Sequence, residues 1–101
     1  MKFLVVGTPG AAPMPPDQAA SILQAAKEWI NARIADGGLE CHYVFPEGGG
    51  FSISNSDSHE ELLGRLLEYP LYPFMTWKLR PLCEWSDSYD KFIERWQKRV
   101  G

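Results

Sequence analysis

The sequence has few cysteines, no long apolar segment and no concentrated positive charge, and each absence argues against a class of protein. Only two cysteines occur among 101 residues, Cys41 and Cys83, and they have no CxxC spacing. A disulfide scaffold and a four-ligand zinc site are therefore disfavoured. No apolar run approaches the ~20 residues of a membrane span, and Phe3–Val6 is too short for the core of a signal peptide. We expect a cytoplasmic protein with reduced cysteines.

The charged residues do not form the basic surface that nucleic acids require. The formal net charge is −3 with a pI near 5.3, and the basic residues are scattered apart from the pair Lys98-Arg99. A protein that follows a phosphate backbone needs clustered lysine and arginine. Gly48-Gly49-Gly50 is not a phosphate-binding loop either, because no Gly-Lys-Ser follows it. We therefore expect neither a nucleic-acid partner nor a membrane partner.

Apolar residues, in contrast, are plentiful enough for a folded core. They make up 45% of the chain, including four Trp, four Tyr and five Phe. This composition predicts a single folded domain over residues 1–101. A domain of this size buries roughly two-thirds of its unfolded surface, which leaves little room for an enclosed ligand cavity within one chain. We therefore expect a homodimer or a larger homo-oligomer.

The order of the periodic segments predicts an α+β fold. Apolar residues alternate in the strands and recur every three to four positions in the helices. The order β-α-β-β-α-β is the ferredoxin-like arrangement, a four-stranded antiparallel sheet with two helices on one face and the other face bare. Its usual strand order, 4-1-3-2, places the two cysteine-bearing strands at opposite edges. The expected elements are strands at 2–7, 39–45, 51–54 and 75–84, and helices at about 16–36, 58–69 and 87–99.

The terminal helix is expected to be amphipathic. Its apolar residues Tyr89, Phe92, Ile93 and Trp96 share one face, and Lys98 and Arg99 suit the negative end of the helix dipole. This spacing predicts that the four apolar side chains pack into a core. The pattern leaves open whether that core belongs to the helix's own chain or to a neighbouring one.

The segment from Ser58 to Met75 resembles the second helix and following turn of the muconolactone Δ-isomerases. Its most specific part is Pro-Leu-Tyr-Pro-Phe-Met at 70–75. Leu82-Cys83 follows at the family's spacing, and Lys27-Glu28 with Asp36-Gly37 matches the family's first helix. The resemblance implies a dimeric α+β barrel that assembles further, as a decamer in the isomerases. It also implies a pocket between the sheet and neighbouring chains.

Candidate site residues follow from the resemblance and from the chemistry of shifting a double bond. Such a shift removes a proton next to a carbonyl and returns it elsewhere, which one base of suitable pKa performs. Glu28, implied by the family's Lys-Glu pair, and His42 are the candidate catalytic residues. The candidate cations for a substrate carboxylate are Lys27 and Arg80, and the candidate aromatic binding residues are Tyr43, Tyr72 and Trp77. No metal and no cofactor are expected.

Each candidate also has a structural explanation, so several functions stay open. Lys27 and Glu28 suit a solvated helix face, and the aromatic residues suit core or interface packing. Ala25-Ala26 stands where the isomerases carry an acidic patch. The expected function is an isomerase or cyclase that transfers a proton on an unsaturated lactone or related carbonyl compound. The alternatives are a non-catalytic binding module and a structural subunit of the same fold.

Overall fold

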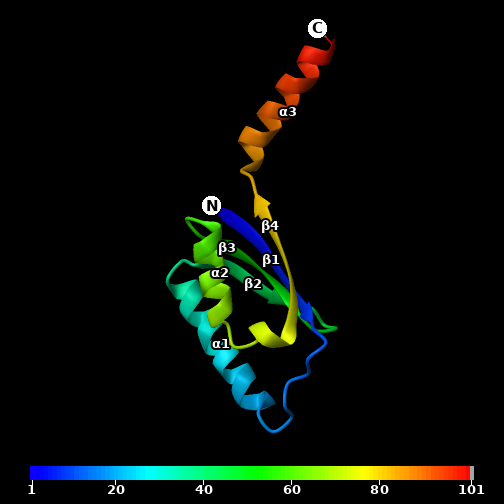
Figure 1. Ribbon diagram of the computed structural model, residues 1–101. Coiled ribbons are helices and arrows are strands. Elements are labelled where there is room, and N and C mark those ends of the chain that lie inside the picture. The colour runs from blue at the N-terminus through cyan, green and yellow to red at the C-terminus, as the bar shows by residue number, and fades with distance from the viewer. Residues whose placement is uncertain (101) are drawn as a thin grey trace.

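The computed structural model describes residues 1–100, and it confirms the expected α+β fold (Figure 1). Four antiparallel strands form one sheet in the order β2-β3-β1-β4, so β2, which carries Cys41, and β4, which Cys83 directly follows, lie at opposite edges as expected. Helices α1 and α2 cover one face of this sheet. The elements are β1 (Lys2–Pro9), α1 (Ala19–Ala35), β2 (Leu39–Val44), β3 (Gly50–Asn55), α2 (His59–Glu68), the 3-10 turn η1 (Tyr72–Phe74), β4 (Met75–Leu82) and α3 (Trp85–Val100).

The register of the strands assigns side chains to the two faces of the sheet. Val5 of β1 lies opposite Ser52 of β3, and His42 of β2 lies opposite the same serine, so these side chains share the helix-covered face. Leu4 of β1 lies opposite Arg80 of β4, on the other face. That second face carries no helix of the same chain. We call it the helix-free face, and it presents Leu4, Val6, Tyr43, Phe51, Ile53, Lys78 and Arg80.

The core lies between β1 and α2. Phe3 and Val5 from the strand pack with Leu62 and Leu66 from the helix, and all four side chains are buried. Helix α2 begins where its sequence predicts, because the Ser58 hydroxyl accepts a hydrogen bond from the Glu61 backbone N–H at 3.0 Å. The apolar stripe of α2 thus packs against the sheet and covers β1 on this face.

Helix α1 begins later than its sequence suggested. The expected start was residue 16, but Pro16 and the next two residues form a turn, and the Gln18 N–H bonds the Pro15 carbonyl before the helix starts at Ala19. The expected end is confirmed, since Gly37 adopts a left-handed φ of 82° just after the helix.

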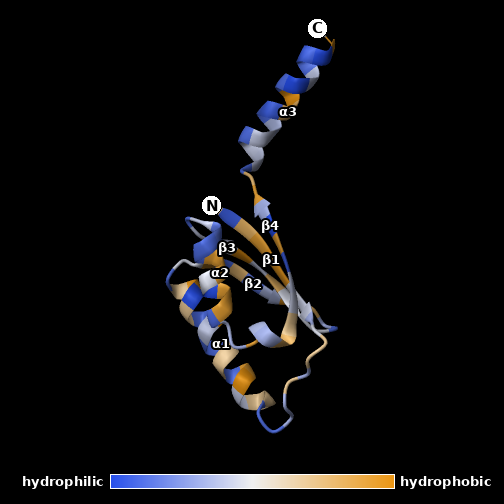
Figure 2. Cartoon of the chain, viewed as in Figure 1, coloured by the Kyte–Doolittle hydropathy of each residue, from blue (hydrophilic) through white to orange (hydrophobic). Residues whose placement is uncertain are grey.

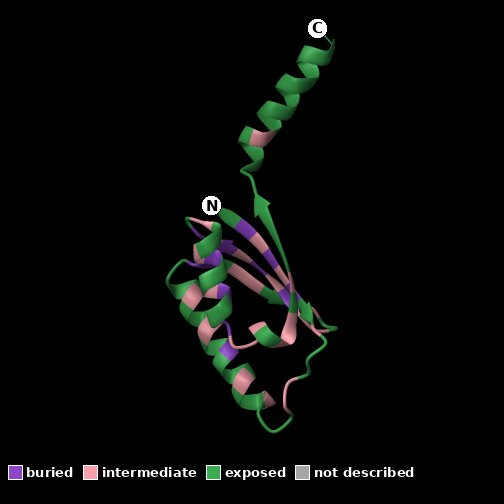
Figure 3. Ribbon diagram, viewed as in Figure 1, coloured by how far each residue is buried: buried purple, intermediate pink, exposed green. Residues whose placement is uncertain are grey.

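Helix α3 corrects two expectations about the C-terminal segment. It begins at Trp85 and projects away from the sheet at the end of β4, instead of packing on its own chain (Figure 1). No residue of α3 is buried, and Trp96 is 62% exposed. Figure 3 shows that the helix is exposed along its length except at Ser88, which is partly buried. Cys83 is exposed because it lies in the short connection to this helix.

The projecting helix makes the chain elongated. Its Cα radius of gyration is 17.3 Å, whereas a compact domain of this length has about 13 Å. Within residues 1–100, no helix combines the length and apolar character needed to cross a membrane.

Candidate functional site

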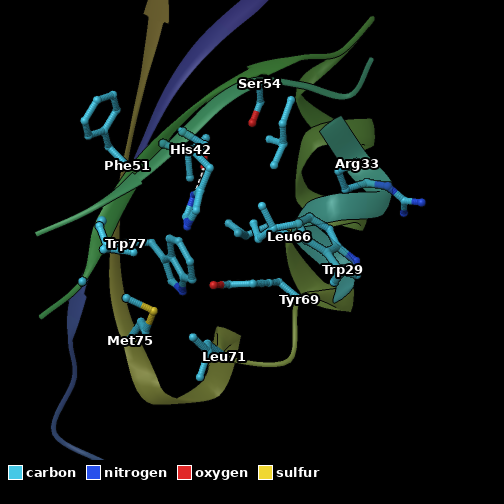
Figure 4. A pocket seen from close by; sticks show the side chains of 18 of the residues that line it. Trp29, Arg33, His42, Phe51, Ser54, Leu66, Tyr69, Leu71, Met75 and Trp77 are labelled. Carbon is cyan, nitrogen blue, oxygen red and sulfur yellow. Dashed lines mark hydrogen bonds between the residues drawn. The ribbon is translucent and has the colours of Figure 1, made fainter. Parts of the chain in front are cut away.

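A cavity of about 240 Å³ lies between the helix-covered face of the sheet and helices α1 and α2 (Figure 4). Its walls come from the strands, from α1 and α2, and from Tyr69 and Leu71 in the segment between α2 and η1, and most of them are apolar. The expected pocket was one between the helix-free face and neighbouring chains, but this cavity lies on the opposite side of the sheet and within one chain. Its main apolar residues are Val5, Leu23, Ile30, Leu39, Leu62, Leu66, Leu71, Met75 and Trp77.

Gly7 leaves the space that the Trp77 side chain occupies. A Cβ atom at Gly7 would lie 2.8 Å from the Trp77 ring and 2.9 Å from the Met75 methyl group. The Trp77 ring stacks on Tyr72 with centroids 6.0 Å apart, and its Nε1 donates to the Tyr72 carbonyl at 3.1 Å. The indole therefore forms a fixed, flat wall of the cavity.

His42 supplies the central titratable group of the cavity. Its ring points into the cavity, and Nδ1 lies 2.7 Å from the hydroxyl oxygen of Ser52, directly across the strand pair (Figure 4). Ser52 is buried and His42 is half-buried. Burial lowers the pKa of His42 below its ordinary value, because the charged imidazolium loses hydration there. The imidazole is therefore neutral at neutral pH and available as a base.

Tyr69 is the second polar group of the cavity. Its ring lies between Trp29 and Trp77, with centroids 5.1 and 5.9 Å away, and its hydroxyl points into the cavity (Figure 4). Burial raises the pKa of Tyr69. The phenol therefore stays protonated and can donate a hydrogen bond.

The two cations beside the cavity already have acidic partners. Arg33 Nε lies 2.8 Å from a carboxylate oxygen of Asp36, and the Arg33 guanidinium points away from the cavity (Figure 4). Arg65 binds Glu61 at 2.5 Å and also donates to a backbone carbonyl. Neither arginine offers a free positive charge to a ligand. Among residues 1–100, no group of three His, Cys, Asp or Glu side chains is placed to hold a metal ion.

The structure brings together some of the expected site residues and separates others. His42 and Trp77 line the cavity, and Tyr72 supports Trp77 from behind. The remaining candidates lie elsewhere: Tyr43 and Arg80 on the helix-free face, and Lys27 and Glu28 exposed on α1. Glu28 accepts a hydrogen bond from Gln24 at 3.2 Å on that helix surface.

Sequence reasoning missed Tyr69 and Ser52 as site residues. Tyr69 directly precedes the Pro-Leu-Tyr-Pro-Phe-Met segment, but its position in the sequence did not show that its hydroxyl points into a cavity. Ser52 alternates with apolar residues in β3. This alternation showed which residues share a face of the strand, but not that the face of Ser52 lines a cavity. Their roles depend on the pairing of β2 with β3 and on the position of α2.

Comparison with solved structures supports the fold. The chain is similar to muconolactone isomerase, with a TM-score of 0.74, 24% identity, and coverage of 83% of this chain and 90% of that one. It is also similar to 5-chloro-2-hydroxyhydroquinone dehydrochlorinase from Burkholderia phenoliruptrix AC1100, solved in complex with 2,5-dihydroxybenzoquinone. That comparison has a TM-score of 0.58, 10% identity, and coverage of 83% and 95%. The expected likeness to muconolactone isomerase is thus confirmed for the fold.

Sequence comparisons do not extend this result. No family model matches the chain. No curated protein matches it either. The structural neighbours are small-molecule enzymes, and the activity of this chain has to be argued from its own cavity.

Proposed function

We propose that this protein is an isomerase of the muconolactone isomerase type that moves a proton within a small, ring-shaped carbonyl compound. The observation that carries the proposal is the neutral His42 imidazole, held by Ser52 inside an apolar cavity. A neutral imidazole in apolar surroundings is the form of histidine that can accept a carbon-bound proton.

The proposed mechanism uses two side chains in separate roles. His42 directs Nδ1 toward Ser52, which leaves Nε2 to accept a proton from the carbon next to the substrate carbonyl. Negative charge then develops on the carbonyl oxygen, and the Tyr69 hydroxyl stabilises it by donating a hydrogen bond. The imidazolium, whose N–H exchanges with solvent, then gives a proton to a different carbon, so the double bond moves and no other reactant is consumed. Trp77 holds the flat ring of the substrate.

The charges around the cavity favour a substrate without a free carboxylate. The expected cations for a carboxylate, Lys27 and Arg80, lie outside the cavity, and the arginines beside it are paired with Asp36 and Glu61. A buried carboxylate without a cation costs several kcal/mol, on the order of the desolvation of an ion. We therefore propose neutral unsaturated lactones and cyclic enones as the substrate class.

The test follows carbon-bound protons by NMR in D₂O. Unsaturated lactones and cyclic enones are first screened for binding by ligand-detected NMR, and binders are then incubated with the wild-type protein. We expect loss of the proton signal next to the carbonyl and appearance of the shifted double bond. Binding without exchange supports the binding-module alternative, and absence of any binder supports a structural subunit.

We also propose that the helix-free face forms a homodimer. Leu4, Val6, Phe51 and Ile53 lie on this face and are only half-buried within one chain. An apolar sheet face of this kind is normally covered, and sheet-to-sheet packing covers it economically. Analytical ultracentrifugation at micromolar concentration should show at least twice the mass of the 11.4 kDa chain. A single species at the monomer mass contradicts the homodimer.

A further inference from the structure

Helix α3 carries a row of exposed aromatic and apolar side chains that no part of its own chain covers (Figure 3). Figure 2 shows hydrophilic and more apolar residues alternating along this helix. The exposed aromatic area is on the order of 500 Å² per chain, since each aromatic side chain presents roughly 150–250 Å² when fully exposed. Contiguous apolar patches of this size mark interaction sites. We call this surface the aromatic stripe, and it consists of Trp85, Tyr89, Phe92, Ile93, Trp96 and Val100, each 54–86% exposed.

The spacing of the aromatic stripe suits a helix as its partner. Trp85, Tyr89, Phe92 and Trp96 recur at intervals of four, three and four residues, the pattern of helices that pack side by side. Helices α1 and α2 of the same chain lie beside the sheet, whereas α3 extends beyond it, and the chain measures 65 Å along its longest axis (Figure 1). The partner helix therefore has to come from another molecule.

Helix α2 presents a matching surface on its solvent side. Leu63 and Leu67 are 49% and 57% exposed, and a Cβ atom added at Gly64 would meet nothing within 4 Å. Glycine inside a helix lowers helix stability and often marks a place where another element approaches closely. We call Leu63, Gly64 and Leu67 the α2 outer face. It has the flat, apolar shape that bulky aromatic side chains of an approaching helix can cover.

The charges on the two surfaces are complementary. Residues 1–84 carry ten acidic and six basic side chains, whereas α3 carries four basic and three acidic ones. Glu60 and Glu68 lie next to the α2 outer face, and Arg95 and Arg99 lie along one side of the aromatic stripe. Arg99 also packs over the Trp96 ring, 5.3 Å from its centroid, and so lies at the edge of the contact surface.

We propose that α3 of one molecule docks through its aromatic stripe on the α2 outer face of a second copy of this chain. A reciprocal exchange of two such helices would cover two aromatic stripes, on the order of 1,000 Å² before the α2 outer faces are added, which approaches the roughly 1,200 Å² at which stable interfaces begin. The α2 outer face and the helix-free face lie on opposite sides of the molecule. Both contacts can therefore exist in one assembly, which would then be larger than a dimer.

The test places the photo-crosslinking residue p-benzoylphenylalanine at position 92, in place of Phe92, in the full chain. Equal amounts of ¹⁴N- and ¹⁵N-labelled protein are mixed, irradiated and digested, and the crosslinked peptides are identified by mass spectrometry. We expect crosslinks to residues 59–68, with half of them joining peptides of different isotope labels. The matched control carries p-benzoylphenylalanine at position 91, on the opposite side of α3, and should give few crosslinks.

Two variants in α2 separate docking from folding. Leu67→Glu should lower the yield of mixed-isotope crosslinks at least about tenfold, because it places a charge in the contact. Gly64→Gln should lower the yield similarly while the melting temperature stays the same or rises, since glutamine favours the helix but blocks close approach. Crosslinks only within one isotope label, only to other surfaces such as the sheet or a second α3, or none at all, overturn the proposal.

Discussion

Replacing His42 by Gln is expected to lower the rate of substrate proton exchange by about 10²–10⁴-fold, the usual contribution of a positioned base. Glutamine keeps a polar group opposite Ser52 but has no basic nitrogen. Affinity for the ligand should change only a few-fold, because the apolar walls around Trp77 and Leu66 remain. Loss of rate with affinity kept identifies a base, whereas loss of both identifies a binding residue. Exchange rates and ligand titrations by NMR measure the two quantities.

The matched control for this variant is Glu28→Gln. Glu28 was the other candidate base, and its side chain is exposed on α1 outside the cavity. Its replacement should leave the exchange rate within about twofold of wild type, as expected for a surface substitution. A large loss in Glu28→Gln and none in His42→Gln would contradict the proposed role of His42.

The pH dependence of the wild-type rate provides an independent check on His42. Burial lowers the pKa of this group, so the neutral base persists to a lower pH than a solvated histidine would allow. The rate should therefore fall to half of its high-pH value at a pH below 6.5, the ordinary histidine value. A decline centred above that value would contradict the effect of burial.

Local patterns in the sequence predicted most of the fold. The alternation around Tyr43, the glycine at Gly37 and the cap at Ser58 each determine a strand, a helix end or a helix start over a few residues. The strand order followed from the β-α-β-β-α-β arrangement, because few chain paths connect such elements. These features depend on neighbouring residues or on chain connectivity, which a sequence displays directly.

The site was only partly predictable, because it depends on which face of the sheet the helices cover. His42 and Tyr43 were known to point to opposite faces, but the alternation is identical on both faces. The cavity lies beneath α2, so it contains His42 and not Tyr43. Tyr69 enters the site only because α2 ends there, with its ring between Trp29 and Trp77. Such positions depend on contacts between distant segments.

The aromatic spacing in α3 predicted burial, and the structure shows why that inference fails for one chain. Periodicity identifies the apolar face of a helix but does not identify what covers it. Trp96 and Phe92 have the same spacing that a core helix would have, yet α3 leaves the end of β4 without turning back to the sheet. The expected burial therefore has to come from an intermolecular contact, which is the one proposed with α2.

The buried core and the exposed stripe predict opposite results for two phenylalanine substitutions. Phe3 is 4% exposed and packs with Val5, Leu62 and Leu66, so Phe3→Ala should lower the free energy of unfolding by about 3–4 kcal/mol. Phe92→Ala should lower it by less than about 0.5 kcal/mol in dilute protein, where copies are apart. Urea denaturation measures both, and Phe3→Leu serves as a milder variant if Phe3→Ala does not fold.

Protein concentration then distinguishes a free helix from a docked one. Association stabilises the folded chain by mass action, so the stability of wild type should rise with concentration. If α3 takes part in that association, the difference between wild type and Phe92→Ala should grow from dilute to concentrated protein, whereas the deficit of Phe3→Ala should be present throughout. Equal deficits for both variants in dilute protein would mean that the aromatic stripe packs within its own chain.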